Sequence, residues 1–287
     1  MESAFGQPVC SYTDAETGLV VVSVFVQTKP DWSRAGRAEL VSGLKRIAGH
    51  GLNIGPGKVV LERIRREDWA ESWKLHFKPV LIGSALLLKP SWSRRLARKG
   101  QVEVVLDPGL SFGTGRHPTT AFCLRQLVVR RRAGEAQSCL DVGAGSGILA
   151  IAAAKLGYAP VEAFDSDPEA LGIARANARR NGVAARIRFR RQDLTQLPRR
   201  GARQYSLICA NLSSSLLMSE RERILARLRA DGVLVIAGVL RGEFAEVQRR
   251  FESAGLRLVG SHAHNEWHSG AFCWRSVGGP PAGGASG

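Results

Sequence analysis

Cysteine is scarce and scattered in this chain of 287 residues. Its five cysteines, at positions 10, 123, 139, 209 and 273, are an odd number and form no CxxC pair. This pattern excludes a disulfide framework and a sulfur-ligated zinc site, and it fits reduced thiols in a cytosol. The chain also lacks an apolar run near the roughly 18 residues of a membrane span, and its start, MESAFGQPVC, has no basic segment followed by an apolar one. We therefore expect a soluble cytoplasmic protein.

Acidic residues are also few, with 25 Asp and Glu against 41 Lys and Arg, which gives a formal net charge of +16. Such a charge favours contact with nucleic acid, because Lys and Arg dominate phosphate binding. Arginine clusters occur at 94–98, 130–132, 186–191 and 249–250, dispersed along the chain and without interleaved aromatic residues. An ordinary solvated surface and an rRNA- or ribosome-facing surface both remain open.

The first third of the chain alternates between strand-like and helix-like segments. Apolar patterning predicts strands at 20–26 and 59–64, helices at 34–48 and 67–76, and a further strand-like segment at 79–89. This order suits a small α+β domain of the ferredoxin-like kind. The segment 89–100 is short, basic and interrupted by proline, so we place a domain boundary near it.

From Ser138 onward the alternation becomes regular. It predicts strands at 139–142, 161–164, 186–190, 206–210, 233–238 and 256–259, helices at 147–156, 168–180, 215–228 and 242–254, and an added antiparallel strand at 271–275. Strands that alternate with helices of this length are typical of a doubly wound parallel α/β sheet.

The stretch LDVGAGSG, residues 140–147, lies between the first strand and the first helix of this regular region. Its glycines let the backbone turn tightly and approach a ligand, and the helix N-terminus that follows offers free N–H groups. This is the geometry of a nucleotide-type cofactor site. The dinucleotide pattern GxGxxG fails, because Ile148 stands where its third glycine would be. Asp141, two residues before Gly143, favours a cofactor with a cationic sulfonium and an amino-acid tail, such as S-adenosylmethionine.

Two aspartates follow the next predicted strand. Asp165 lies 22 residues after Gly143, where an acid accepts hydrogen bonds from the ribose hydroxyls of a nucleotide cofactor. Asp167 directly precedes Pro168, and we expect it to cap the helix that begins there.

Polar residues also end the third and fourth predicted strands. Asp193 either meets the adenine edge of the cofactor or is an ordinary turn aspartate. Asn211 carries an amide that can orient the nitrogen that accepts a methyl group. It could also cap the helix that follows, a role for which Ser213 and Ser215 compete.

Four motifs, DPGLSFGTGRHPTT, DVGAGSGILAIAAAKLG, FDSDPEAL and ANL, resemble in order and spacing those of the PrmA family of ribosomal protein lysine methyltransferases, which use S-adenosylmethionine. The similarity runs from Asp68 onward and includes GVLVIAGVL and EWHSGAF, whereas the first 60 residues match only in predicted architecture. It implies a Rossmann-like class I methyltransferase fold behind a smaller N-terminal α+β domain. This chain departs from the family pattern at Arg116 and at Leu212 to Ser214.

The resemblance also implies the residues of the site. The first motif would be a loop that closes over the cofactor, and Asn211 would be the catalytic residue near the methyl acceptor. The implied cofactor-binding residues are Phe112, Gly113, Thr114, His117, Thr119, Thr120, Asp141, Gly143, Gly145, Asp165, Ser166, Asp193 and Asn211. We expect no metal site. The expected domains are a substrate-recognition domain at 1–92, a linker and cofactor-covering loop at 93–120, the methyltransferase domain at 121–277 and a disordered tail at 278–287.

His117 has two candidate roles. It could act as a general base, because histidine titrates near neutrality, or it could fix the loop by hydrogen bonding. We favour the structural role, because methyl transfer to an amine mainly requires alignment of the nitrogen, methyl and sulfur atoms.

The expected function is S-adenosylmethionine-dependent transfer of methyl groups to amines of a large-subunit ribosomal protein, at lysine side chains or the N-terminal amine. We expect the enzyme to act as a monomer. The alternatives are a methyltransferase for another protein lysine or a small molecule on the same scaffold, and a non-catalytic factor that binds the ribosome or RNA.

Overall fold

The computed structural model describes residues 9–13, 20–24, 33–49, 57–61, 78–107, 117–200 and 203–275. Contacts divide the chain into two compact units, Met1–Arg66 and Glu67–Gly287. Within the described residues, no helix is both long enough and apolar enough to cross a membrane.

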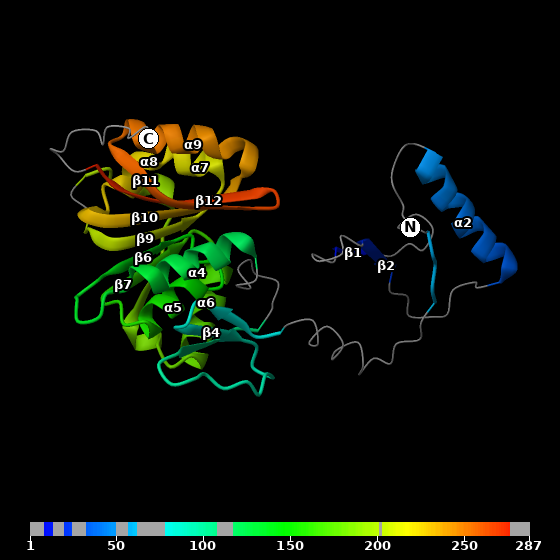
Figure 1. The fold of residues 1–287 in the computed structure, drawn as a ribbon, viewed down its shortest axis with the longest axis horizontal. Coiled ribbons are helices and arrows are strands. Elements are labelled where there is room, and N and C mark those ends of the chain that lie inside the picture. Colours follow the sequence, from blue (N-terminus) through cyan, green and yellow to red (C-terminus); the bar gives the residue numbers. More distant parts are fainter. Residues whose placement is uncertain are drawn as a thin grey trace, which may run out of the picture. The chain divides into compact units, whose positions relative to one another are not determined.

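The first unit contains an antiparallel strand pair and a helix. The pair consists of β1 (Val9–Thr13) and β2 (Val20–Val24), and the helix is α2 (Arg34–Gly49) (Figure 1). The predicted strand at 20–26 and helix at 34–48 are confirmed over these ranges. The strand predicted at 59–64 is wrong for residues 59–61, which pair with no strand in the described part of the chain. The helix predicted at 67–76 lies outside the described residues, so the ferredoxin-like arrangement stays a prediction.

A seven-stranded sheet forms the centre of the second unit, in the order β11-β12-β10-β9-β6-β7-β8. Its strands are β6 (Cys139–Val142), β7 (Val161–Asp165), β8 (Ile187–Arg191), β9 (Tyr205–Asn211), β10 (Leu228–Leu240), β11 (Leu256–His264) and β12 (Trp267–Trp274). The pairs among β8, β7, β6, β9 and β10 are parallel, and β12 is antiparallel to both its neighbours. The doubly wound sheet and its added antiparallel strand are confirmed.

Helices cover both faces of this sheet (Figure 1). One face carries α4 (Pro118–Arg130), α5 (Ile148–Lys155) and α6 (Pro168–Arg180), and the other carries α7 (Ser214–Ser219), α8 (Arg221–Leu225) and α9 (Arg241–Ser253). Two short 3-10 helices, η1 (Ala184–Arg186) and η2 (Leu194–Gln196), flank β8. Strand residues alternate between the two cores: Cys139 packs on the α5 side, whereas Leu140 and Val142 pack on the α9 side.

The single helix predicted at 215–228 is wrong. Glu220 leaves the helical conformation, with φ −101° and ψ 13°, and separates α7 from α8. Leu217 and Ile224 are both buried on either side of this break. The spacing of apolar residues therefore did not reveal the break at Glu220, because the side chains on both sides of the break remain buried.

A small third sheet lies against α4 and α5 and belongs to the same unit. It contains β3 (Val80–Ile82), β4 (Leu86–Lys89) and β5 (Val102–Val105), with β3 antiparallel and β5 parallel to β4. Asn181, at the end of α6, accepts a hydrogen bond from Val105 N at 2.8 Å and donates one to Val105 O at 2.7 Å.

The domain boundary expected near 89–100 is therefore misplaced. The contacts divide the chain between Arg66 and Glu67. Leu86, Leu88 and Val104 join the buried core of the second unit, so the basic segment between β4 and β5 is a connection within one small sheet. The expected tail at 278–287 and most of the expected covering loop, residues 108–116, lie outside the described residues.

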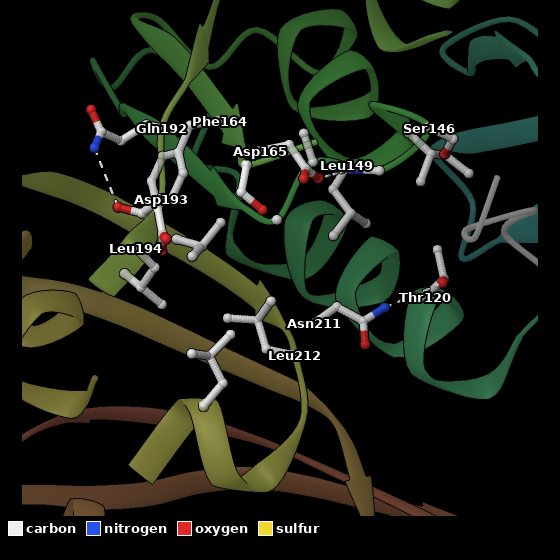
Figure 2. Close-up of a pocket in the computed structure, with 17 residues that line it drawn as sticks. Thr120, Ser146, Leu149, Phe164, Asp165, Gln192, Asp193, Leu194, Asn211 and Leu212 are labelled. Atoms are coloured by element: carbon white, nitrogen blue, oxygen red, sulfur yellow. Dashed lines mark hydrogen bonds between the residues drawn. The ribbon is translucent and has the colours of Figure 1, made fainter. Parts of the chain in front are cut away.

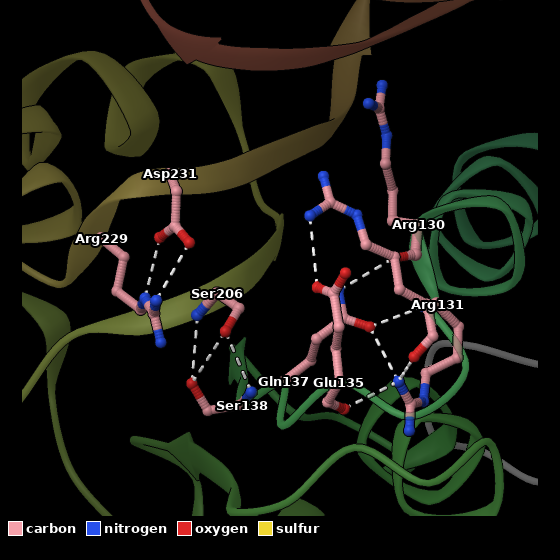
Figure 3. A network of polar contacts seen from close by, with 9 residues as sticks. Arg130, Arg131, Glu135, Gln137, Ser138, Ser206, Arg229 and Asp231 are labelled. Carbon is pink, nitrogen blue, oxygen red and sulfur yellow. Dashed lines mark hydrogen bonds and ion pairs between the residues drawn. The ribbon is translucent and has the colours of Figure 1, made fainter.

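Polar contacts fix the beginning of β6 and β9 (Figure 3). Gln137 closes the end of α4: its Nε2 donates to Arg130 O at 2.9 Å, and its Oε1 accepts from Arg132 N at 2.7 Å. Ser138 and Ser206 exchange hydrogen bonds between backbone N–H and side-chain hydroxyl, at 3.1 and 3.0 Å. These bonds help to set the register between β6 and β9, and so determine how the carboxyl ends of the two strands are aligned at the site.

Candidate functional site

A cavity of about 280 Å³ opens at the carboxyl ends of the parallel strands (Figure 2). The turns after β6, β7, β8 and β9 supply most of its wall. The residues that line it are Thr120, Val142, Gly143, Ala144, Gly145, Ser146, Ile148, Leu149, Phe164, Asp165, Ser166, Gln192, Asp193, Leu194, Asn211, Leu212 and Leu216. Seven of the predicted site residues are therefore brought together around one cavity: Thr120, Gly143, Gly145, Asp165, Ser166, Asp193 and Asn211.

The loop between β6 and α5 needs its glycines for two physical reasons. Gly143 has φ +75° and Gly147 has φ +78°, a left-handed conformation that costs other residues energy. A Cβ at Gly143 would also lie 2.7 Å from Leu212 Cδ2, and one at Gly147 would lie 2.9 Å from Ala174 Cβ. The loop therefore passes close to the β9 turn on one side and to α6 on the other.

Asp141 lies beneath this loop and not on the cavity wall. Its side chain is buried, and Oδ2 accepts a hydrogen bond from Ala150 N at 3.1 Å, in the first turn of α5. Oδ1 has no hydrogen-bond partner among the described residues. Burial raises the pKa of this carboxyl to about 8. The direct cofactor contact expected of Asp141 is untested, and the observed contact supports the start of α5.

Asp165 points from the end of β7 toward the cavity (Figure 2). Its Oδ2 accepts from Gly145 N at 2.9 Å, and its Oδ1 accepts from Asp167 N at 3.0 Å. The carboxylate thus holds the glycine loop and is itself held by two backbone amides. Each oxygen keeps a further lone pair for a hydroxyl donor.

Asp167 caps α6, as predicted. Its side chain accepts a hydrogen bond from Glu169 N at 2.8 Å, and Pro168 follows as the first helical residue.

Asp193 has the turn-capping role, and its contact with the adenine edge stays a prediction. Its Oδ1 caps η2 by accepting from Thr195 N and Thr195 Oγ1, both at 2.8 Å, and it also lines the cavity. These hydrogen bonds, first that from the backbone N–H and then that from the hydroxyl, lower the pKa of Asp193. Beside it, Gln192 donates to the Asp193 carbonyl at 3.2 Å (Figure 2).

Asn211 ends β9 and faces the same cavity from the opposite side to Asp165 (Figure 2). Its Nδ2 donates to Thr120 Oγ1 at 3.5 Å, whereas its buried Oδ1 has no partner among the described residues. Ser213 occupies the N-cap position of α7, so Asn211 does not have the capping role. The Asn211 side chain thus lines the cavity with a buried amide oxygen whose acceptor capacity is unused.

Gly238 supports this arrangement from β10. It has φ +81° and lies where the pairing of β10 with β12 is irregular. A Cβ here would be 2.9 Å from Asn211 Oδ1 and 2.6 Å from Leu212 O. Only glycine leaves room for the β9 turn in this position.

His117 lies outside the cavity wall, at the N-cap position of α4. Its Nδ1 is 2.7 Å from Thr119 Oγ1, and its ring meets Trp267 edge to face at a centroid distance of 5.0 Å. Burial lowers the pKa of His117, and the charge of Glu266 opposes this effect. Thr119 is buried and is likewise absent from the cavity wall. These contacts favour the structural role of His117, which stays a prediction. Phe112, Gly113, Thr114 and Arg116 lie outside the described residues.

Sequence reasoning missed the apolar part of the wall. Phe164, Leu194 and Leu216 line the cavity next to the polar residues. Their apolar character is equally typical of core positions, so nothing in their pattern marks them as wall residues. Gln192 had a signal, because it directly follows β8 at the carboxyl edge of the sheet.

The fold and the site together define a class of protein. A sheet with one antiparallel strand, a glycine loop after β6, a carboxylate after β7 and a cavity-lining asparagine after β9 are typical of Rossmann-like class I methyltransferases.

Comparison with known proteins identifies the family within this class. The model of the family "Ribosomal protein L11 methyltransferase (PrmA)" matches residues 13–272. Curated proteins named ribosomal protein L11 methyltransferase include one from Trichlorobacter lovleyi, 39% identical over 80% of this chain and 74% of its own length. Another, from Exiguobacterium sp., is 34% identical over 93% of this chain and 84% of its own length.

A crystal structure of the ribosomal protein L11 methylase from Lactobacillus delbrueckii subsp. bulgaricus shares this fold. It superposes with a TM-score of 0.61 at 26% identity and covers 69% of this chain and all of its own. The chain therefore belongs to the ribosomal protein L11 methyltransferase (PrmA) family, and it is a methyltransferase.

Proposed function

We propose that this protein transfers methyl groups from S-adenosylmethionine to amines of ribosomal protein L11, at lysine side chains or the N-terminal amine, and that it works in the cytoplasm as a monomer. The substrate part of the proposal is supported by the names of its relatives. The single structural observation that carries the chemistry is the unpaired Oδ1 of Asn211, whose side chain lines the cavity.

The residues present fit the donor. Asp165 would bind ribose hydroxyls with its remaining lone pairs, and the glycine loop leaves room for close approach of a ligand to backbone N–H groups. Phe164, Leu194 and Asp193 would surround the adenine. When bound, S-adenosylmethionine would supply an electrophilic methyl group on a cationic sulfur.

The acceptor side needs an amine that is neutral and correctly directed. Asn211 Oδ1 would accept an N–H hydrogen bond from this amine and so aim its lone pair into the cavity. The donation from Asn211 Nδ2 to Thr120 Oγ1 supports this orientation, because it leaves Oδ1 as the acceptor end of the amide. Water would take the released proton, since His117 lies outside the wall.

The test measures methyl transfer to recombinant L11. The purified protein is incubated with methyl-deuterated S-adenosylmethionine and L11, and intact-mass and peptide mass spectrometry record which amines gain label. Asn211→Ala is the inactive comparison, and Ser253→Ala, an exposed change in α9, is the matched control. Label on L11 amines that depends on Asn211 supports the proposal.

Other outcomes select the alternatives. Label on a different ribosomal protein or on a small molecule, with none on L11, would give the enzyme another substrate on the same scaffold. Absence of S-adenosylmethionine binding by isothermal titration would leave a non-catalytic factor and remove the proposal altogether.

A further inference from the structure

More than half of the net positive charge of this chain lies in one short segment. Residues 175–203 contain ten arginines, at positions 175, 179, 180, 186, 188, 190, 191, 199, 200 and 203, and a single acid, Asp193. All ten arginines are exposed. Because the whole chain has a net charge of +16, about a tenth of its length carries more than half of the excess.

The fold gathers much of this segment along one border of the sheet. In the described part of the chain, the strand β8 is an edge strand and pairs only with β7. Ile187 and Phe189 point toward the core shared with α5, so Arg188 and Arg190 project from the other face of the sheet. Arg175 reaches from α6 to the Phe189 carbonyl at 3.5 Å. We call the surface formed by Arg175, Arg186, Arg188, Arg190, Arg191 and Arg203 the basic edge.

Little acidic charge neutralises the basic edge. Glu162 on β7 accepts from Arg203 at 2.9 Å and pairs with Arg190 at 3.6 Å. Arg186, Arg188 and Arg191 form no ion pair within the described ranges. Like charges this close repel one another, so the arrangement destabilises the free protein unless an anion binds there.

Another arginine-bearing surface of the same unit has a balanced charge. Helix α9 carries Arg241, Arg249 and Arg250, and it also carries three glutamates, at positions 243, 246 and 252. A general preference of this protein for arginine therefore does not account for the basic edge.

We propose that the basic edge binds the phosphate backbone of RNA. Guanidinium groups bind phosphate oxygens in a bidentate manner and keep their charge at any physiological pH. No strand among the described residues pairs with the outer side of β8, so the backbone N–H groups there are further donors that suit phosphates. A linear array of arginines along a strand edge fits an extended polyanion better than a compact anionic ligand. This activity does not depend on the methyl-transfer function, because the basic edge lies outside the cavity wall.

The experiment uses the full chain and a fluorescein-labelled RNA hairpin. Fluorescence anisotropy gives the affinity at several salt concentrations between about 50 and 200 mM. The variant R186Q/R188Q/R191Q removes three unpaired charges from the basic edge. The control R241Q/R249Q/R257Q removes three exposed charges near β11, the strand at the opposite border of the sheet.

We expect wild-type binding to weaken steeply with salt. The basic-edge variant should lower the magnitude of the slope of log affinity against log salt by about 2–3, since each lost phosphate contact removes roughly 0.9. The control variant should keep the wild-type slope. Circular dichroism verifies that both variants are folded.

Three results would overturn the proposal. One is an equal decrease of the salt slope in the control variant, which would show that RNA binding depends on net charge and not on the basic edge. Another is displacement of the labelled RNA by poly-glutamate as readily as by unlabelled RNA, which would favour an acidic protein partner. The third is binding to phosphatidylserine vesicles without binding to the hairpin, which would make the edge a membrane-facing surface.

Discussion

Gly238 is the place where one added methyl group should disturb the acceptor side of the site most. In Gly238→Ala, the new Cβ would start 2.6 Å from Leu212 O and 2.9 Å from Asn211 Oδ1. Ordinary contact needs about 3.5 Å, so these atoms must retreat by roughly 0.5–1 Å. A displacement near 1 Å of a positioning group costs about 10²-fold in rate. We therefore expect a turnover number about 100-fold below wild type.

The same change also affects stability, and the two effects can be separated. Alanine at φ +81° costs about 1–2 kcal/mol, and the steric overlap adds about 1–3 kcal/mol. The thermal midpoint should fall by about 2–4 °C for each kcal/mol. Affinity for S-adenosylmethionine should change little, because Asp165 and the glycine loop are not among the atoms that the new Cβ meets.

A matched control isolates the backbone cost. Gly134 has φ +79°, and an added Cβ there meets no atom within 4 Å among the described residues. Gly134→Ala should therefore lose stability but keep the wild-type rate. Steady-state kinetics with both substrates saturating, well below the thermal midpoint, gives the comparison. If Gly238→Ala turned over within threefold of wild type, or Gly134→Ala slowed equally, the assigned role of Gly238 would be wrong.

Three further changes test the site. Asp165→Ala should weaken S-adenosylmethionine binding by about 1–3 kcal/mol, the cost of hydroxyls left unpaired; isothermal titration with unaltered affinity would remove the ribose role. Asn211→Ala should lower the turnover number by about 10²-fold at nearly constant cofactor affinity. A wild-type rate in the methylation assay would show that the unpaired Oδ1 of Asn211 does not bind the amine. Asp141→Asn tests the buried carboxyl: burial raises the pKa of Asp141 to about 8, so the folded protein keeps a proton that the unfolded chain loses near pH 4. The stability that the protonated carboxyl contributes is full at low pH and is lost as the pH rises toward 8. Because asparagine does not titrate, the thermal midpoint of Asp141→Asn should rise relative to that of wild type over this pH window. A difference between the two midpoints that stays constant with pH in calorimetry would contradict the raised pKa.

Where local chemistry determines the start and end of an element, the sequence was sufficient to predict its bounds. The predicted helix at 168–180 matches α6 at both ends, because Asp167 and Pro168 fix its start and Asn181 and Gly182 follow its end. The strands from β6 to β9 were likewise predictable within one or two residues, since each is a short apolar run between turn residues.

Where the structure depends on packing between residues that are distant in the chain, the sequence was not sufficient to predict it. Leu86 and Leu88 formed a recognisable apolar run, but nothing local showed that α4 and α5 would bury it, and the domain boundary was misplaced as a result. The site shows the same limit. Residue type and strand position predicted Asp165 and Asn211, whereas the wall position of Phe164 depends on which neighbours leave one side of its ring uncovered.

The reciprocal bond between Ser138 and Ser206 has a consequence for how this site can diversify. Residues proposed for the methyl donor come from the ends of β6, β7 and β8, and residues proposed for the acceptor come from the ends of β9 and β10. The two groups meet along the ladder between β6 and β9, whose register the serines fix at the far end, and where Leu212 approaches Gly143. Substitutions beyond Leu212 can therefore change which amine is accepted while the donor side stays intact. Substrate specificity and cofactor binding therefore depend on two groups of residues that adjoin along one boundary and can change separately.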